Sequence, residues 1–295
     1  MATLQHIRRR VSSVQNTRKI TKAMEMVAAA KLRRAQQRIE ALRPYADGTV
    51  EMMRDLATFA DERRAYALLR QNEGAGVEAL LVVTGDRGLA GAFNANVVRH
   101  YLETDAALRD RGLATRLLTV GKKGVGTLRF RGCEVERSWT GLSDRPEYAD
   151  ASAIARYVID LYTQREVDRV HLVYNHFKSA MEQRVTDMTI LPIEPQAVYR
   201  EAQDADRLPP VSYLYEPGKA AIFESLLPKY VEIAIHRALL ESSASEQGAR
   251  MTAMRNASDA AEEMLSTLTL QLNRARQASI TQEILEVVAG AEALG

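Results

Sequence analysis

The chain has few of the residues that build disulfide-bonded or metal-binding proteins. It contains one cysteine, Cys133, which excludes an internal disulfide and a thiolate cluster for a metal. None of its histidines has the H-E-x-x-H spacing of a catalytic zinc helix, and no serine lies in a nucleophile elbow. They are His6, His100, His171, His176 and His236. We therefore predict no metal, no cofactor and no catalytic residue, and a reducing compartment.

Long apolar runs are also missing. None approaches the roughly 18–20 residues that a membrane-spanning helix needs. The N-terminus shows no apolar core of the secretory type. Aromatic residues make up only 6% of the chain, a content that suits long helices better than a large mixed core.

Glycine is scarce at both ends, and there the apolar residues follow heptads. In residues 1–43, one column contains Leu4, Val11, Arg18, Glu25, Leu32 and Ile39, and the other Ile7, Val14, Thr21, Ala28, Ala35 and Leu42. Residues 219–293 have the columns Tyr230, Arg237, Ala244, Met251, Ser258, Leu265 and Leu272, and Ile233, Leu240, Gln247, Met254, Ala261, Leu268 and Ala275. Two such stripes predict an antiparallel coiled coil of the N- and C-terminal helices, projecting from a globular middle.

The middle of the first stripe has a second apolar strip beside it, formed by Ile20, Met24 and Val27. One interpretation is local drift of the stripe around the helix. The other is that this helix faces two surroundings, its partner helix and an outer sleeve. The pattern alone does not separate them.

Strands and helices alternate between the two ends. We predict strands over 77–84, 115–120, 133–138, 169–174 and 182–190, and helices over 95–109, 127–130 and 148–164. This order indicates a Rossmann-like α/β domain with a mostly parallel sheet. The proposed domains are residues 1–70 (N-terminal helix, with a kink or break at Pro44), 71–218 (α/β domain and connector) and 219–295 (C-terminal helix, starting near Ala220 or Lys229).

Two features leave a binding function open. GDRGLAGAFN follows a predicted strand, and GKKGVG follows another, but neither has the spacing of a dinucleotide or phosphate loop. Residues 1–43 hold eleven Lys and Arg against two Glu, so this helix needs an acidic neighbour, either nucleic acid or an anionic protein loop. The alternative function is therefore a coiled-coil dimerising module that binds nucleotide or nucleic acid.

Four segments settle the family. RRVSSVQNTRKITKAMEMVAAAKLRRAQ (9–36), GDRGLAGAFN (85–94), YLYEP (213–217) and ARQASITQEILEVVAGAEAL (275–294) closely resemble the γ subunits of F-type ATP synthases. The resemblance covers both ends and the centre in the right order. Gly85 and Ala90 depart from the family's S-D-R-G-L-C-G pattern, which casts doubt only on a thiol role.

The resemblance implies a rotating central shaft inside a ring of three α and three β subunits, whose lower end sits with the ε subunit on the membrane c-ring. Such a subunit has no active site of its own and binds no nucleic acid. The absence of an evident transit peptide favours a bacterial origin, with the chain peripheral on the cytoplasmic face of the inner membrane.

The resemblance also assigns residues to partners. Lys22, Met24 and Arg250 match positions near an acidic loop of β. Arg276, Gln277 and Thr281 match positions that bind the β catch loop. The residues matched to the c-ring and ε are Tyr213, Tyr215 and Glu216.

Overall fold

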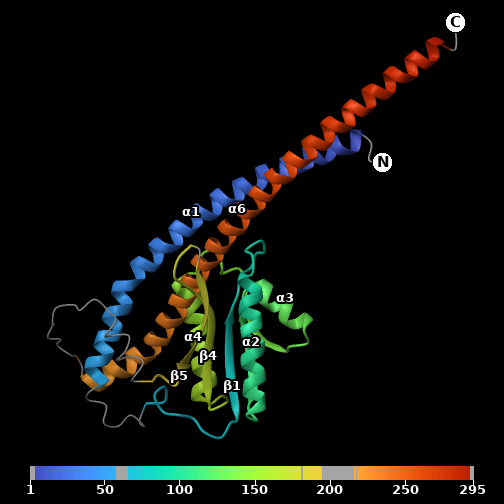
Figure 1. Cartoon of the computed structure of the whole chain (residues 1–295). Helices are drawn as coiled ribbons and strands as arrows, with labels where there is room; N and C mark the ends of the chain where they lie inside the picture. The colour runs from blue at the N-terminus through green and yellow to red at the C-terminus, as the bar shows by residue number, and fades with distance from the viewer. Residues whose placement is uncertain (1–3, 58–65, 181, 195–215, 217, 293–295) are drawn as a thin grey trace. The chain divides into compact units, whose positions relative to one another are not determined.

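The computed structural model describes residues 4–57, 66–180, 182–194, 216 and 218–292, and for 54–57 and 290–292 it describes the backbone only. The chain divides into two compact units (Figure 1). We call residues 1–28 with 250–295 the helix-pair unit, and residues 29–249 the sheet unit. The domain boundaries expected from the sequence stay a prediction.

Two long helices begin and end the described chain, α1 (Leu4–Ala57) and α6 (Lys219–Glu292). The predicted break at Pro44 is wrong, since α1 continues through it. Proline removes one backbone donor, at a cost of about 3 kcal/mol in a helix interior. The next turns bury Ala46, Val50 and Met53, and this apolar burial offsets the cost.

A five-stranded sheet forms the centre of the sheet unit, in the order β3-β2-β1-β4-β5. The strands β1 (Val77–Val83), β2 (Ala114–Val120), β3 (Val135–Trp139) and β4 (Arg169–Phe177) are parallel. The last strand, β5 (Gln183–Leu191), pairs antiparallel with β4. The predicted mostly parallel sheet is confirmed.

Helices cover both faces of this sheet. Alternate residues of β1 point to opposite faces, so Leu80 and Val82 enter one core and Leu81 and Val83 the other. The first core is closed by α2 (Phe93–Asp110) and α3 (Lys122–Phe130), and the second by α4 (Tyr148–Thr163) and parts of α1 and α6 (Figure 1). The three layers explain why β1 is apolar on both faces.

The strands and helices predicted between residues 77 and 190 agree with the observed ones to within three residues at each end, except at α3. That helix begins at Lys122, inside GKKGVG, and not at Thr127. Gly124 packs so closely on Thr84 that a Cβ there would lie 2.5 Å from the threonine Oγ1. The glycine thus serves helix–sheet contact, whereas the sequence suggested a loop.

Candidate partner-binding surfaces

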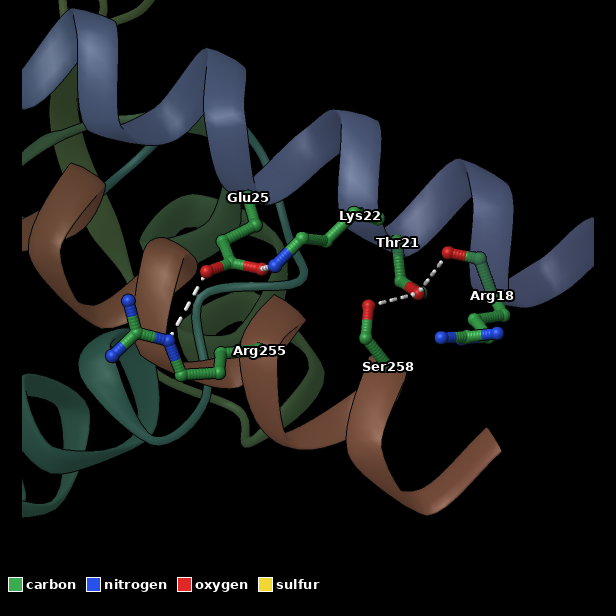
Figure 2. Close-up of polar contacts among 6 residues, drawn as sticks. All are labelled: Arg18, Thr21, Lys22, Glu25, Arg255 and Ser258. Atoms are coloured by element: carbon green, nitrogen blue, oxygen red, sulfur yellow. Dashed lines mark hydrogen bonds and ion pairs between the residues drawn. The ribbon is translucent and has the colours of Figure 1, made fainter. Parts of the chain in front are cut away.

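Within the helix-pair unit, α1 and α6 run antiparallel and are joined by polar contacts. Arg18 lies 3.1 Å from Glu262. Thr21 is 2.7 Å from Ser258, and Arg255 donates to Glu25 at 3.1 Å (Figure 2). Residue numbers rise along one helix as they fall along the other, which fixes the direction. The predicted antiparallel pairing is confirmed.

Glu25 is the centre of this polar layer. Its side chain is almost fully buried between the helices, and it accepts hydrogen bonds from Lys22 at 3.0 Å and from Arg255 (Figure 2). These bonds, first from Lys22 and then from Arg255, lower the pKa of Glu25 below its usual range. Both cations remain largely exposed, so one buried carboxylate orients two positive groups on the surface of the pair.

The apolar strip beside the seam is exposed. Thr21, Glu25 and Ala28 are buried, whereas Ile20 and Val27 are 60% and 56% exposed. The stripe has therefore not drifted around the helix, because the heptad positions still form the seam. This result favours the second interpretation, in which α1 has a partner helix on one face and another surrounding protein on the next.

The last turns of α6 expose an apolar surface on several sides. Between residues 280 and 289 every described side chain is exposed, including bulky ones at 45–72% of their full area: Ile280, Ile284, Leu285, Val287 and Val288. Water is a poor environment for such a helix, and a protein collar is a better one.

The structure describes most of the residues that the sequence assigned to partners. Lys22, Arg276, Gln277, Thr281 and Glu216 are exposed, and the Thr281 hydroxyl donates to the Gln277 carbonyl at 3.0 Å. Met24 is half-buried. Arg250 is only 7% exposed in this chain. Tyr213 and Tyr215 lie outside the described residues. No observation tests these roles, which stay predictions.

Sequence reasoning missed the polar layer itself. Glu25, Ser258 and Arg18 were placed in the heptad columns, but nothing paired them with residues more than 200 positions away. Arg255 and Glu262 lie just outside the columns. A charged residue in a seam position was the available signal, since a buried carboxylate requires a partner.

The GKKGVG turn does not form a phosphate cradle. Gly121 and Gly124 pack against Thr84. At the start of α3, the backbone N–H of Lys122 donates to Asp86 at 3.0 Å. Burial alone would raise the pKa of Asp86, but backbone hydrogen bonds, including those from Ser143 and Lys122, outweigh it and lower the pKa. A carboxylate therefore occupies the helix N-terminus that a phosphate would use.

The described residues hold neither a metal-ligand cluster nor a membrane-spanning helix. Over the ranges given above, no three His, Cys, Asp or Glu side chains are grouped so that they could hold a metal ion. Among the same residues, no helix combines the length and apolarity needed to cross a membrane.

Comparison with known proteins covers the whole chain. A family model described as ATP synthase matches residues 3–294. The ATP synthase gamma chain of Moorella thermoacetica is 45% identical over 295 residues, with all of both chains covered. The gamma chain of Anaeromyxobacter sp. strain Fw109-5 is also 45% identical, over 296 residues, again with full coverage of both.

Solved structures agree with this match. A chain from the central stalk and c-ring structure of the Tetrahymena thermophila mitochondrial ATP synthase is 34% identical, with a TM-score of 0.58, covering 81% of this chain and 99% of the other. A chain of the Euglena gracilis mitochondrial ATP synthase has a TM-score of 0.67 at 20% identity, with coverage of 99% and 94%. The second likeness concerns the fold alone.

Proposed function

The chain belongs to the ATP synthase gamma-chain family, and from this premise we propose that it is the central rotating shaft of a proton-translocating F-type ATP synthase. It couples proton flow through a membrane c-ring to ATP synthesis or hydrolysis on the β subunits. The chain is a non-catalytic subunit, and chemistry takes place in the subunits around it. Three α and three β subunits surround it, and ε and the c-ring bind its other end.

The observation that carries this proposal is the surface of the helix-pair unit. The middle of its heptad seam, including Thr21, Glu25 and Ala28, is buried, yet Ile20, Val27 and the apolar side chains of residues 280–288 are exposed. The seam residues pack between the two helices, and other apolar side chains stay exposed on the outer surface of the pair. Such a surface is expected where other subunits enclose the helices. Because the two helices expose different side chains, each surrounding β subunit meets different contacts, which shifts each to a different conformation.

The proposed contacts follow from the exposed groups. Lys22 and Met24 face the acidic loop of β, where the ammonium group of Lys22 supplies charge complementarity. Arg250 joins them once its buried guanidinium turns outward. Arg276, Gln277 and Thr281 form hydrogen bonds with the β catch loop.

The proposed contacts with the c-ring and ε come from residues that the resemblance assigns to them. These are Tyr213, Tyr215 and Glu216. The subunit is peripheral to the membrane, and we place it on the cytoplasmic face of a bacterial inner membrane. The support is the full-length match to the gamma chains of Moorella thermoacetica and Anaeromyxobacter.

Reconstitution tests the proposal. Purified chain is mixed with matching α and β subunits, any complex is isolated, and its Mg-ATP hydrolysis is compared with that of α and β alone. We expect one copy of this chain per three αβ pairs and strongly raised turnover. Failure to form the complex, together with binding of ATP or of DNA by the chain alone, would overturn the shaft and favour a nucleotide- or nucleic-acid-binding module.

A further inference from the structure

The strand order places a ligand position in the sheet unit. In open α/β sheets, ligands bind outside the carboxyl ends of the strands where the strand order reverses. Here the chain moves from β1 outward to β2 and β3, and then returns to place β4 on the other side of β1. The reversal therefore lies between β1 and β4. We call its carboxyl edge, residues 84–85 after β1 and 175–177 at the end of β4, the switch-point edge.

A segment of α6 occupies this edge. The hydroxyl of Ser245 donates to the backbone carbonyl of Asn175 at 3.1 Å, and His176 Nδ1 lies 2.5 Å from Glu241. Glu246 packs against Gly85 so tightly that a Cβ there would lie 2.8 Å from the glutamate carboxyl carbon. Glu241, Ser245 and Glu246 are all less than 5% exposed.

The same segment is fastened to a neighbouring loop through Asp144. This aspartate accepts a hydrogen bond from Gln247 at 3.2 Å and another from Lys31 of α1 at 2.6 Å. Arg87, in the turn after β1, lies 3.6 Å from the same carboxylate. One side chain thus connects α6, α1 and the turn that precedes α2.

Buried polar contacts resist rotation of a helix more strongly than apolar ones do. Successive residues of an α-helix are about 100° apart, so a small turn of α6 about its axis would swing Ser245, Glu246 and Gln247 away from their neighbours. Buried polar groups without partners are costly, whereas an apolar surface slides with little change in burial.

We propose that residues 241–248 of α6 occupy the position at the switch-point edge where a ligand binds in other open α/β sheets. We also propose that the contact of Glu246 with Gly85 prevents α6 from rotating about its own axis, and we call this contact the torsional clamp. The clamp holds α6 against the sheet. Torque applied to the sheet unit is therefore transmitted to α6, and the helix does not rotate relative to the sheet. Glu246 and Gly85 are positioning residues, remote from the chemistry. The inference rests on the proposed shaft function.

The test uses the whole ATP synthase, assembled with this chain and reconstituted into lipid vesicles. Two variants attack the clamp, Glu246→Ala and Gly85→Ala. Two matched controls leave it intact: Glu263→Ala, at an exposed position of α6, and Gly126→Ala, where a Cβ meets nothing within 4 Å. The measurement is protons pumped per ATP hydrolysed, alongside hydrolysis itself.

We expect both clamp variants to hydrolyse ATP within about two-fold of the unchanged enzyme and to lose at least about five-fold in protons pumped per ATP. The controls should keep the unchanged ratio. A clamp variant with an unaltered ratio contradicts the inference. A purely stabilising contact would lower the yield of complex and leave the ratio as it was. If the unchanged chain forms no complex, the result contradicts the proposed shaft function and not only the clamp.

A disulfide at the contact provides a second test, in which the oxidised and reduced forms of one folded complex are compared. In a Cys133→Ser background, Gly85→Cys and Glu246→Cys place two thiols at the contact, and the disulfide replaces the clamp. Oxidation should restore the pumping ratio to within about two-fold of the unchanged enzyme, and reduction should lower it again by at least about five-fold. Equal ratios in the oxidised and reduced forms of the same complex would overturn the clamp.

Discussion

The helix-pair unit and the central strand of the sheet unit differ in how far their apolar side chains are exposed to solvent. In the sheet unit, residues 79–83 of β1 are at most 2% exposed, and helices cover both faces of the sheet. In the helix-pair unit, Ile20 and Val288 are at least half exposed, while Thr21, Glu25 and Ser258 are buried. The central strand of the sheet unit is therefore enclosed within this chain, whereas the apolar surface of the helix-pair unit is open to other proteins.

The largest expected effect lies in the core of the sheet unit. Leu118 of β2 is fully buried, so Leu118→Ala should lower the free energy of unfolding by about 2–5 kcal/mol. Trp139, the only tryptophan, lies in the same unit and packs against Tyr157, so its fluorescence during urea unfolding reports on this unit. A loss below about 1 kcal/mol would show that the site is less tightly packed than described.

His171 makes the stability of the sheet unit depend on pH. Burial favours its neutral form, but hydrogen bonds with Asp187 and Glu78 outweigh this and raise its pKa above 6.5. Arg169 lies near Glu78, and His100 near Asp187, both at 4.0 Å. A raised pKa stabilises the fold at acidic pH, and this contribution disappears as pH rises through the raised value.

We therefore expect urea unfolding, followed through Trp139, to show lower stability at pH 9 than at pH 6 (chosen on either side of the usual histidine pKa of about 6.5). His171→Gln removes the titrating group and should flatten this dependence. His6→Gln, in an exposed position of the other unit, is the control. An equally steep profile in His171→Gln would assign the dependence to a different group.

Glu25 makes the stability of the helix-pair unit depend on pH in the opposite direction. Its pKa is lowered, so it stabilises the unit above its ordinary value of 4.5, and the contribution is lost as pH falls through the lowered pKa. Hydrogen exchange of the amides of residues 18–28 measures local opening of the pair. Exchange in the unchanged chain, corrected for intrinsic rates, should rise as pH falls below 4.5, and Glu25→Gln should remove most of the rise. A profile unchanged by this substitution would contradict the role of Glu25.

The smallest effect on stability belongs to the exposed end of α6. Leu285 is 62% exposed, so Leu285→Ala should change the free energy of unfolding of the free chain by less than about 0.5 kcal/mol. It removes the same atoms as Leu118→Ala and is its matched control. On the proposed enclosure of this end of α6, Leu285→Ala should weaken assembly with α and β, measured in a titration of the subunits. Normal assembly would count against enclosure.

The sequence predicted the repetitive parts of this fold and missed contacts that depend on register between distant segments. Heptad spacing predicted the seam, and alternation of strands with helices predicted the parallel sheet. The contacts of Glu25 with Arg255 and of Gly85 with Glu246 need the alignment of segments 150 residues or more apart, which no local pattern encodes. The start of α3 was predicted too late because a glycine that permits close packing, such as Gly124, looks the same in sequence as one that permits a turn.

The antiparallel pairing has a consequence for how the protein is made. Thr21 and Ser258 are neighbours in the folded chain and 237 positions apart in the sequence. At translation rates of about 5–20 residues per second, the first helix leaves the ribosome roughly 10 to 50 seconds before its partner exists. During that interval its seam, including Ile7 and Ala28, has nothing to pack against. A subunit whose two ends pair with each other must therefore protect the seam of its first helix until the chain is complete.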